Sequence, residues 1–350
     1  MLKWIDFSLA AGCSVSTRQP LKDYLDNAIP RKRDTFRNLL IATWNLKDFG
    51  SLTESWKADS TVTPRRDWRA LWAITEIISR FDVVALQEVT GNLKALRTLL
   101  KTLGEDWQFL MTDINARQGG DERLAFLFDV RRVRLSGLAC ELVIPPDESP
   151  GRKIEASTLQ KQFVRTPYAI GFQAGAETFV LVTLHVIFGK GKVGRSEELK
   201  AIAQWMADWA KKVNDWEQNL IVLGDFNIDN PASPLWKAFT ETGLIIPAIL
   251  KQALRSIFAG QSNFDKYYDQ IAWFEDRLHL KCTNGGYVSF LERIYKGFPP
   301  DDVQYRISDH YPLWVEFACR NKYEIDFARA ERGQAAEPQK MPASMPAVST

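Results

Sequence analysis

The segment from Leu220 to Asn227, LIVLGDFN, is the most informative stretch of the sequence. Its four apolar residues are followed at once by a glycine, which predicts a short buried β-strand. An acid and an amide come next, Asp225 and Asn227, so the strand end presents polar side chains. Asp and Asn also favour ordinary turns, so this stretch alone leaves both a functional and a turn-forming role open.

The same arrangement recurs along the chain. Five other apolar runs are flanked by a residue that is able to bind a metal ion or to move a proton. A strand end is a rigid mount for a polar group, and ligands of α/β proteins gather at such edges. The runs are 39–44, 83–86, 181–184, 270–274 and 313–317, and the flanking residues are Asn45, Gln87, Glu88, His185, Asp269, Asp309 and His310.

Helices alternate with these strands in the first third of the chain. Helical spacing of apolar residues predicts helices over 67–79 and 92–103 in this part of the chain. The same spacing predicts a further helix later in the chain, over 196–213. Strands alternate with helices up to about residue 110, and the middle of the chain is rich in strands, as in an antiparallel or mixed sheet. The pattern favours an α/β protein in which two sheets pack together with helices outside them.

Three regions differ in composition. Residues 1–37 are mixed and basic, and we expect a solvated lead-in segment. Residues 38–319 carry all of the strand and helix patterns and form one expected domain. The periodicity fades after residue 320, so 320–350 is an expected disordered tail.

Composition excludes several classes of protein. The chain has 350 residues, 45% of them hydrophobic, which excludes a wholly disordered protein. Lys and Arg total 45 and Asp and Glu total 43, so the net charge of +2 gives no global attraction to nucleic acid or membranes. No apolar run reaches the length of a transmembrane helix. We expect a monomer without stable membrane association.

The N-terminus and the cysteines bear on the compartment. The stretch that ends at Cys13 has the look of a lipoprotein cleavage site, but Asp6 interrupts it and it is short for an export signal. The four cysteines form no CxxC pair, which favours reduced thiols. We therefore expect a cytoplasmic protein.

Histidine usage sharpens the prediction of a site. The sequence has 3 histidines, and His185 and His310 stand at strand ends. Taken alone, either histidine could equally have a structural role. His279 lies between two leucines, and we expect its role to be structural. Carboxylates and an amide without cysteine suit Mg²⁺ or Mn²⁺, whereas zinc usually takes more His or Cys ligands. Two histidines beside such a metal suit acid and base roles in phosphoryl chemistry.

These motifs resemble a known family. Gly224–Asn227, Gln87–Val89 and Ile307–Pro312 are similar to blocks of the endonuclease/exonuclease/phosphatase superfamily, in its deoxyribonuclease I-like branch, and stand in the family's order. The resemblance covers residues 39–318 and implies a layered sandwich of two mixed β-sheets packed face to face, with helices outside. Asp121–Phe128 and Phe163–Pro167 resemble segments that carry a catalytic acid and a phosphate-binding arginine.

The resemblance implies a metal site and a base. Glu88 would be the main ligand of Mg²⁺, for which Mn²⁺ would substitute, and Asn45 and Asp309 would lie nearby. His310 would accept a proton from the attacking water, with Asp269 holding its tautomer. Asn45 could instead cap a turn.

The resemblance also implies an acid and phosphate-binding groups. His185 would protonate the leaving oxygen, held by Glu122. Asp225 and Asn227 would bind metal-bound water or a phosphate oxygen, and Arg165 would neutralise phosphate charge. A surface acid at Glu122 and a structural ion pair at Arg165 remain open.

Two positions depart from the family pattern. Thr90 and Gly120 replace an arginine and a tyrosine that bind duplex DNA in the deoxyribonuclease I-like branch, which puts a duplex substrate in doubt. Five basic residues in loops either meet a substrate backbone or are solvated. They are Arg65, Arg66, Lys190, Lys192 and Arg195.

The sequence leaves three alternative functions to be tested. The first is a metal-dependent phosphodiesterase, an endonuclease or exonuclease on DNA or RNA. The second is a phosphatase or phosphodiesterase on a small-molecule or lipid phosphate ester. The third is a catalytically silent binding module, which the full set of acids and histidines disfavours.

Overall fold

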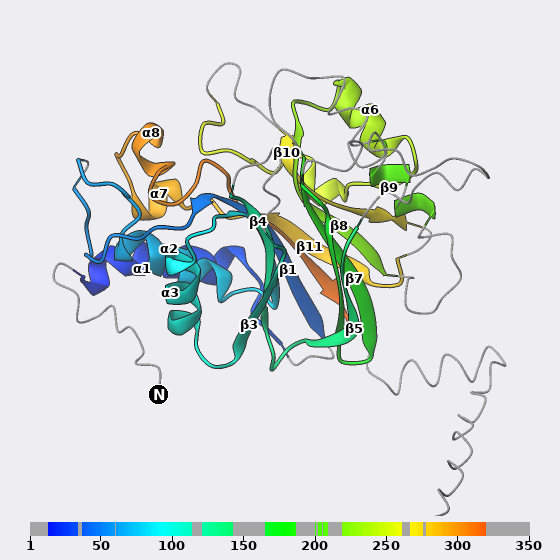
Figure 1. Cartoon of the computed structure of the whole chain (residues 1–350), viewed down its shortest axis with the longest axis horizontal. Helices are drawn as coiled ribbons and strands as arrows, with labels where there is room; N and C mark the ends of the chain where they lie inside the picture. The colour runs from blue at the N-terminus through cyan, green and yellow to red at the C-terminus, as the bar shows by residue number, and fades with distance from the viewer. Residues whose placement is uncertain are drawn as a thin grey trace, which may run out of the picture.

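The computed structural model contains two six-stranded β-sheets packed face to face, with helices outside them (Figure 1). It describes residues 13–33, 37–59, 61–113, 121–142, 165–186, 219–260, 267–275 and 278–319, together with 200, 202–204 and 206–208. The first sheet contains, in spatial order, β11 (Lys281–Tyr287), β12 (Leu313–Ala318), β1 (Asn38–Phe49), β2 (Val83–Val89), β4 (Arg123–Asp129) and β3 (Trp107–Met111). The second contains β5 (Arg134–Glu141), β6 (Tyr168–Ala174), β7 (Glu177–His185), β8 (Leu220–Ile228), β10 (Tyr267–Phe274) and β9 (Leu244–Ile245).

Both sheets are mixed. β1 pairs with β2 in parallel, and β7 pairs with β8 in parallel, whereas the other neighbours are antiparallel. Parallel neighbours need a crossover connection, and α2 (Trp68–Ile78) supplies it between β1 and β2. The predicted α/β sandwich of two mixed sheets is therefore confirmed.

Alternation along β1 separates two cores. Leu39 and Ile41 pack between the sheets, whereas Leu40, Ala42 and Trp44 pack against the helices on the outer face of the first sheet. Successive side chains of a strand project to opposite faces, so a continuous apolar run serves a strand that is covered on both sides. The apolar runs of the sequence are therefore the central strands of the two sheets.

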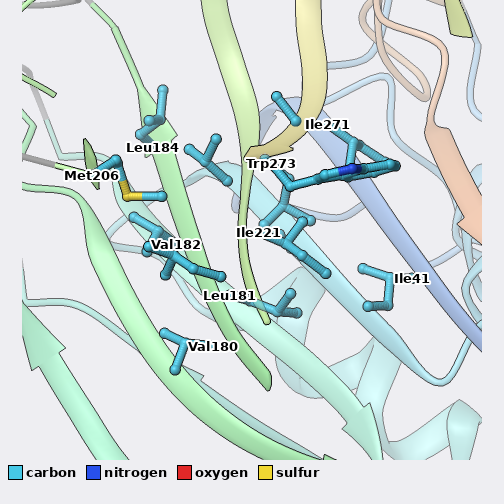
Figure 2. Packing of buried hydrophobic residues seen from close by; sticks show 14 of the residues in the cluster. Ile41, Val180, Leu181, Val182, Leu184, Met206, Ile221, Ile271 and Trp273 are labelled. Atoms are coloured by element: carbon cyan, nitrogen blue, oxygen red, sulfur yellow. The ribbon is translucent and has the colours of Figure 1, made fainter. Parts of the chain in front are cut away.

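The second sheet is covered in the same way. Figure 2 shows Leu181 on the side of Ile41, in the core between the sheets, and Val182 and Leu184 on the opposite side with Met206. Met206 belongs to the described part of the predicted helix 196–213, where 202–204 and 206–208 are helical. A fully buried aliphatic side chain contributes about 1.5–3 kcal/mol to stability.

Helices α2 and α3 (Lys94–Leu103) cover the outer face of the first sheet. Asp67 caps α2, because its carboxylate accepts the backbone N–H of Ala70 at 2.9 Å. The helices expected over 67–79 and 92–103 are thus present, the second beginning two residues later. The remaining helical turns are α6 (Pro234–Thr240), η2 (Ala248–Leu250), α7 (Leu291–Ile294) and α8 (Pro300–Val303).

The N-terminal segment differs from the expected solvated lead-in. Helix α1 (Val15–Ala28) packs against α7 and buries Leu21 and Leu25 in the core with α2. The hydroxyl of Tyr24 accepts the backbone N–H of Ser289 at 3.0 Å, which ties the helix to the domain. The sequence hid this helix because only one apolar pair at i, i+4 spacing marks its buried face in an otherwise polar stretch. The expected tail, 320–350, lies outside the described residues.

The strands are longer than the apolar runs that predicted them. β1 continues to Phe49, β2 to Val89 and β8 to Ile228, so the polar residues predicted to follow these strands belong to their last residues. Asp269 likewise lies inside β10 rather than before it.

Within the described parts of the chain, no helix is both long and apolar enough to span a membrane.

Candidate active site

Strands from both sheets bring polar side chains to one edge of the sandwich. In the first sheet, Asn45 and Gln87 lie in register on parallel strands. In the second sheet, His185 on β7 pairs with Asp225 on β8, which in turn pairs with Asp269 on β10. Residues in register on neighbouring strands project to the same face, so the last three form a row across three strands.

The close approach of β7 and β8 explains the glycine before Asp225. Gly224 has a φ of +142°, and a Cβ there would lie 2.1 Å from the carbonyl oxygen of Leu184. Any side chain would therefore push β7 away from β8 and separate His185 from Asp225. The glycine in LIVLGDFN is required by this backbone contact.

One amide group joins the two sheets. Asn45 Nδ2 donates hydrogen bonds to Glu88 Oε1 at 2.8 Å and to Asp225 Oδ2 at 3.1 Å. The backbone of Asn45 is held in turn, because Ser308 Oγ donates to its carbonyl oxygen at 2.6 Å. Its Oδ1 accepts the N–H of Lys47 at 2.9 Å, so the amide has one possible orientation. Carboxylates from β2 and β8 therefore converge on one buried point.

His310 is paired with a buried carboxylate. Its Nδ1 lies 2.6 Å from Asp269 Oδ2, and its ring stacks on that of Tyr268 with centroids 5.6 Å apart. Burial lowers the pKa of His310, but the carboxylates of Asp269 and Asp309 outweigh it and raise that pKa well above its ordinary value. Burial raises the pKa of Asp269 to about 6, against the opposing effect of His310. The pair leaves Nε2 facing Asp225 Oδ2 at 3.9 Å.

His185 is arranged like His310, with a carboxylate beside its Nδ1. Its Nδ1 lies 3.3 Å from Glu122 Oε2, and its Nε2 lies 3.5 Å from Asp225 Oδ2. Arg165 Nε contacts the same Glu122 oxygen at 2.5 Å. Burial raises the pKa of Glu122, but His185 and Arg165 outweigh it and hold that pKa below its ordinary value. Glu122 is thus partly buried and paired, and Arg165 does form an ion pair in this structure.

Asn227 and Asp309 lie at the margins of this cluster. The backbone N–H of Asn227 donates to Asp225 Oδ1 at 2.9 Å, and its side chain donates to the carbonyl oxygen of Val186 at 2.6 Å. Asp309 Oδ2 contacts Lys47 Nζ at 3.5 Å. All of the predicted site residues are therefore brought to one edge of the sandwich, with Asp309 linked to the centre through Lys47.

The donor set suits a hard cation. Among the residues that the structure describes, no three His, Cys, Asp or Glu side chains are grouped as ligands of a metal ion. Mg²⁺, however, is usually held by one or two carboxylates with water and substrate phosphate completing its shell. Glu88 and Asp225 are the two carboxylates that would meet this need, whereas the Asn45 amide presents its Nδ2 donor to both of them.

Backbone strain is concentrated at the site. Among the described residues, four other than glycine have a positive φ, and all of them border this cluster. Such conformations cost roughly 1–3 kcal/mol each and persist where the surroundings impose them. The four are Lys47 (φ 41°), Asp48 (φ 49°), Glu88 (φ 60°) and Asn227 (φ 49°).

Arg66 is a buried residue beside the candidate site whose role the sequence left open. It is only 3% exposed and donates to the carbonyl oxygens of Leu46, Lys47 and Asp48, each at 2.8 Å. Burial lowers its pKa to about 10, and Asp48 and Glu88 oppose that effect. Arg66 therefore positions the strained end of β1. The sequence carried no signal that separates this buried arginine from the more exposed Arg65.

Other predicted positions are less informative. Thr90 donates its backbone N–H to the carbonyl oxygen of Phe49 at 3.2 Å. Gly120, Lys190, Lys192 and Arg195 lie outside the described residues. The four cysteines are free thiols, of which Cys319 is buried.

Comparisons with known proteins agree with this fold. No protein-family model matches the chain. A protein named deoxyribonuclease from Thioalkalivibrio sp. (strain K90mix) is 23% identical over 292 residues, which are 80% of this chain and 71% of that protein. An endonuclease/exonuclease/phosphatase family protein from Bacteroides thetaiotaomicron has a TM-score of 0.54 at 18% identity, over 81% of this chain and 95% of that one.

Two further solved structures have the same fold. The mannosyl-6-phosphatase of Bacteroides thetaiotaomicron VPI-5482 has a TM-score of 0.53 at 19% identity, over 80% of this chain and 99% of that one. A humanized D. rerio TDP2 has a TM-score of 0.51 at 15% identity, over 80% and 98%. The chain therefore has the fold of the endonuclease/exonuclease/phosphatase proteins, and the resemblance seen in its motifs is confirmed at that level. At sequence identities this low, the comparisons establish the fold only. The reaction has to be argued from the residues of the candidate site.

Proposed function

We propose that the chain is a hydrolase of phosphate esters, and specifically a divalent-cation-dependent phosphodiesterase that cuts DNA or RNA. One observation carries the proposal: His185 and His310 both direct Nε2 at Asp225 Oδ2, at 3.5 and 3.9 Å, and each has a carboxylate behind its Nδ1. Two oriented imidazoles around one point suit a reaction that needs a proton acceptor and a proton donor. The deoxyribonuclease relative supports a nucleic-acid substrate.

The first half of the reaction belongs to His310. In its neutral form the ring accepts a proton at Nε2 from the attacking water, and Asp269, 2.6 Å from Nδ1, holds the tautomer and stabilises the imidazolium that forms. Because Asp269 and Asp309 raise the pKa of His310, the neutral ring that the reaction needs is favoured as the pH rises. Trp44 Nε1 donates to the carbonyl oxygen of His310 at 2.9 Å, which fixes the backbone beneath the ring. These contacts hold the base in one orientation before substrate binds.

The second half belongs to His185. Its Nε2 protonates the leaving oxygen, and Glu122 stabilises the charged ring at Nδ1. Arg165, beside Glu122, neutralises charge on the phosphate, and Asp225 with Asn227 orients the phosphate or the water around it. Glu88, with Asn45 and Asp309 nearby, would hold the divalent cation, which would supply a Lewis acid to offset charge on the phosphate oxygens.

The test uses the purified full chain with Mg²⁺ or Mn²⁺. Plasmid, single-stranded DNA, RNA and bis-p-nitrophenyl phosphate are offered, with EDTA as the control. We expect cutting of a nucleic acid that EDTA abolishes. Hydrolysis of small esters alone would favour the alternative function as a small-molecule phosphatase or phosphodiesterase, and no hydrolysis would favour a silent binding module.

His310→Ala separates the site from a contaminant. A positioned acid or base contributes roughly 10²–10⁴-fold to rate, so kcat should fall by about that factor. The matched control is His279→Ala, because His279 is exposed, lies outside the cluster and donates its backbone N–H to Asn219 Oδ1. Near-normal activity of His310→Ala would rule out the assignment.

A further inference from the structure

An exposed aromatic ring stands beside the proposed site. Tyr305 is 53% exposed, and among the described residues it is the one aromatic side chain that is exposed rather than buried or half-buried. It lies between α8 and the Ser308–His310 segment of the site. A large ring left in solvent beside a polar cluster is more informative than a scattered exposed aliphatic residue.

Two cations flank this ring. Lys47 Nζ lies 5.8 Å from the ring centroid, and Arg65 Cζ lies 5.6 Å from it. Both distances are at the long end of the range for a cation beside an aromatic face, so neither group covers the ring closely. We call Tyr305, Lys47 and Arg65 the Tyr305 platform.

The two cations are held without being fully neutralised. Arg65 Nη1 contacts Asp302 Oδ1 at 2.8 Å, and the other oxygen of Asp302 contacts Arg306 Nε at 2.7 Å, so one carboxylate is shared by two arginines. Lys47 contacts Asp309 at 3.5 Å. The side chains of Lys47 and Arg65 keep 24% and 35% of their surface exposed, which leaves both accessible to an anion.

The platform adjoins the proposed catalytic residues. The N–H of Lys47 donates to Asn45 Oδ1, and Asn45 bonds both Glu88 and Asp225. Lys47 therefore belongs to the platform through its side chain and to the site through its backbone. Lys47 Nζ lies 5.8 Å from the Tyr305 ring and 3.5 Å from Asp309, so this one side chain links the platform to the site.

We propose that the Tyr305 platform is a subsite for one nucleotide of a single-stranded nucleic acid, an inference that rests on the proposed function. The base stacks on Tyr305, and the adjoining phosphate pairs with Lys47 and Arg65. Aromatic rings combined with cations are the usual means of binding single strands, because every unpaired base offers a flat face. A base inside a duplex is already stacked on both sides, so the platform favours single strands.

Binding without hydrolysis tests the subsite directly. The probe is a fluorescein-labelled oligothymidylate, measured by anisotropy in EDTA at low salt, where phosphate contacts are strongest. Tyr305→Ala should raise Kd by about 5- to 150-fold, the range for the loss of one base–aromatic stack. Tyr305→Phe should bind as the native chain does, and Leu135→Ala, an exposed residue on β5, is the matched control.

A scan of the ligand distinguishes stacking from a structural effect. Oligonucleotides that lack one base at each position in turn should reveal one position where the native chain loses affinity. Tyr305→Ala should lose that dependence on position, whereas a merely misfolded variant would lose affinity at every position alike. Arg65→Ala should weaken binding of all the oligonucleotides equally, with Arg134→Ala, an exposed arginine on β5, as its control.

The outcomes separate this inference from the proposed function. Unchanged binding by Tyr305→Ala, a position dependence that survives in it, or no binding by the native chain overturns the subsite, whatever the chain hydrolyses. Binding that depends on Tyr305 in a chain that hydrolyses nothing would leave the subsite standing and overturn the nuclease. Because no divalent cation is available in the binding assay, hydrolysis cannot contribute to it, and the two results are independent.

Discussion

The two ends of β1 carry buried charges that are arranged in opposite ways. At the N-terminal end, near Asn38, two buried aspartates face cations: Arg132 contacts Asp82 at 2.8 Å, and Lys32 contacts Asp129 at 3.2 Å. Arg131 adds a second contact to Asp129 at 2.8 Å. We call these residues, Lys32, Asp82, Asp129, Arg131 and Arg132, the basal cluster.

At the C-terminal end, carboxylates face one another. Glu88 and Asp225 share the Asn45 amide, and within the described residues neither forms an ion pair with Lys or Arg. The backbone is strained at this end, at Lys47 and Asp48. The comparison teaches that the basal cluster balances its charge inside the protein, whereas the charge of Glu88 and Asp225 is the kind that the proposed function leaves for a ligand to balance.

Removing a cation from the basal cluster should have the largest effect on stability. Arg132→Met removes the nearer of the two cations that contact the fully buried Asp82 and leaves only Lys32, 3.8 Å away, so it should lower the free energy of unfolding by up to about 3–5 kcal/mol. Urea unfolding measures the loss. Activity per folded molecule should stay unchanged, because this end is remote from the site.

A double variant is the control for that effect. Asp82→Asn in the Arg132→Met background removes the uncompensated charge and should recover part of the lost stability. A loss below about 1 kcal/mol in the single variant would show that the basal cluster is not a stabilising one.

Removing the Asp129 carboxylate from the basal cluster should have a smaller effect on stability than Arg132→Met, and this effect should depend on pH. Burial raises the pKa of Asp129, but Arg131 and Lys32 outweigh it and lower that pKa below its ordinary value of 3.8. A carboxylate with a lowered folded-state pKa stabilises the protein above the unfolded-state pKa, and this contribution is lost as pH falls through the folded-state value. Asp129→Asn should therefore cost about 1–2 kcal/mol at neutral pH, reduced by the exposure of Arg131.

Urea unfolding at a series of pH values measures this difference. The gap between the native chain and Asp129→Asn should be constant above about pH 5 and should close below pH 3.8. A gap that widened as the pH fell would contradict the assigned direction of the pKa.

Relief of strain at the other end should have the smallest effect. Asp48 has an exposed side chain and a φ of 49°, a conformation that glycine adopts freely, so Asp48→Gly should raise the free energy of unfolding by about 0.5–1 kcal/mol. The control, Arg31→Gly, is exposed and has no positive φ, and should lower it by a similar amount. Thermal unfolding of both variants provides the measurement, and equal destabilisation of both would argue against strain at Asp48.

Sequence alone predicted the parts of the fold that have a strong local pattern. Val83–Leu86 and Leu220–Leu223 were found because strands covered on both faces need continuous apolar runs. β5 and β11 were missed, since they lie at sheet edges and carry polar and small residues. Helix α1 was missed because one apolar pair, Leu21 and Leu25, marks its buried face in an otherwise polar stretch.

The candidate site, like the fold, was predictable from the sequence only where its residues stand next to a strong local pattern. Polar residues next to apolar runs, such as His185 and Asp225, stand out in the sequence and are brought together by strand register. The role of Arg66 depends on carbonyl oxygens of another segment, and the Tyr305 platform depends on three segments meeting. Such arrangements have no local pattern and need the tertiary structure.

The amide of Asn45 makes the chemistry sensitive to the alignment of the whole sandwich. It bonds one carboxylate from each sheet, so a sliding of one layer against the other by ~1 Å would break one of its two bonds, and errors of that size are enough to impair catalysis. Phe172, whose ring meets Phe126 and Phe128 of the opposite layer, helps to fix that alignment far from the reacting groups. If the proposed function holds, loss of turnover would report damage to the core before the chain unfolds.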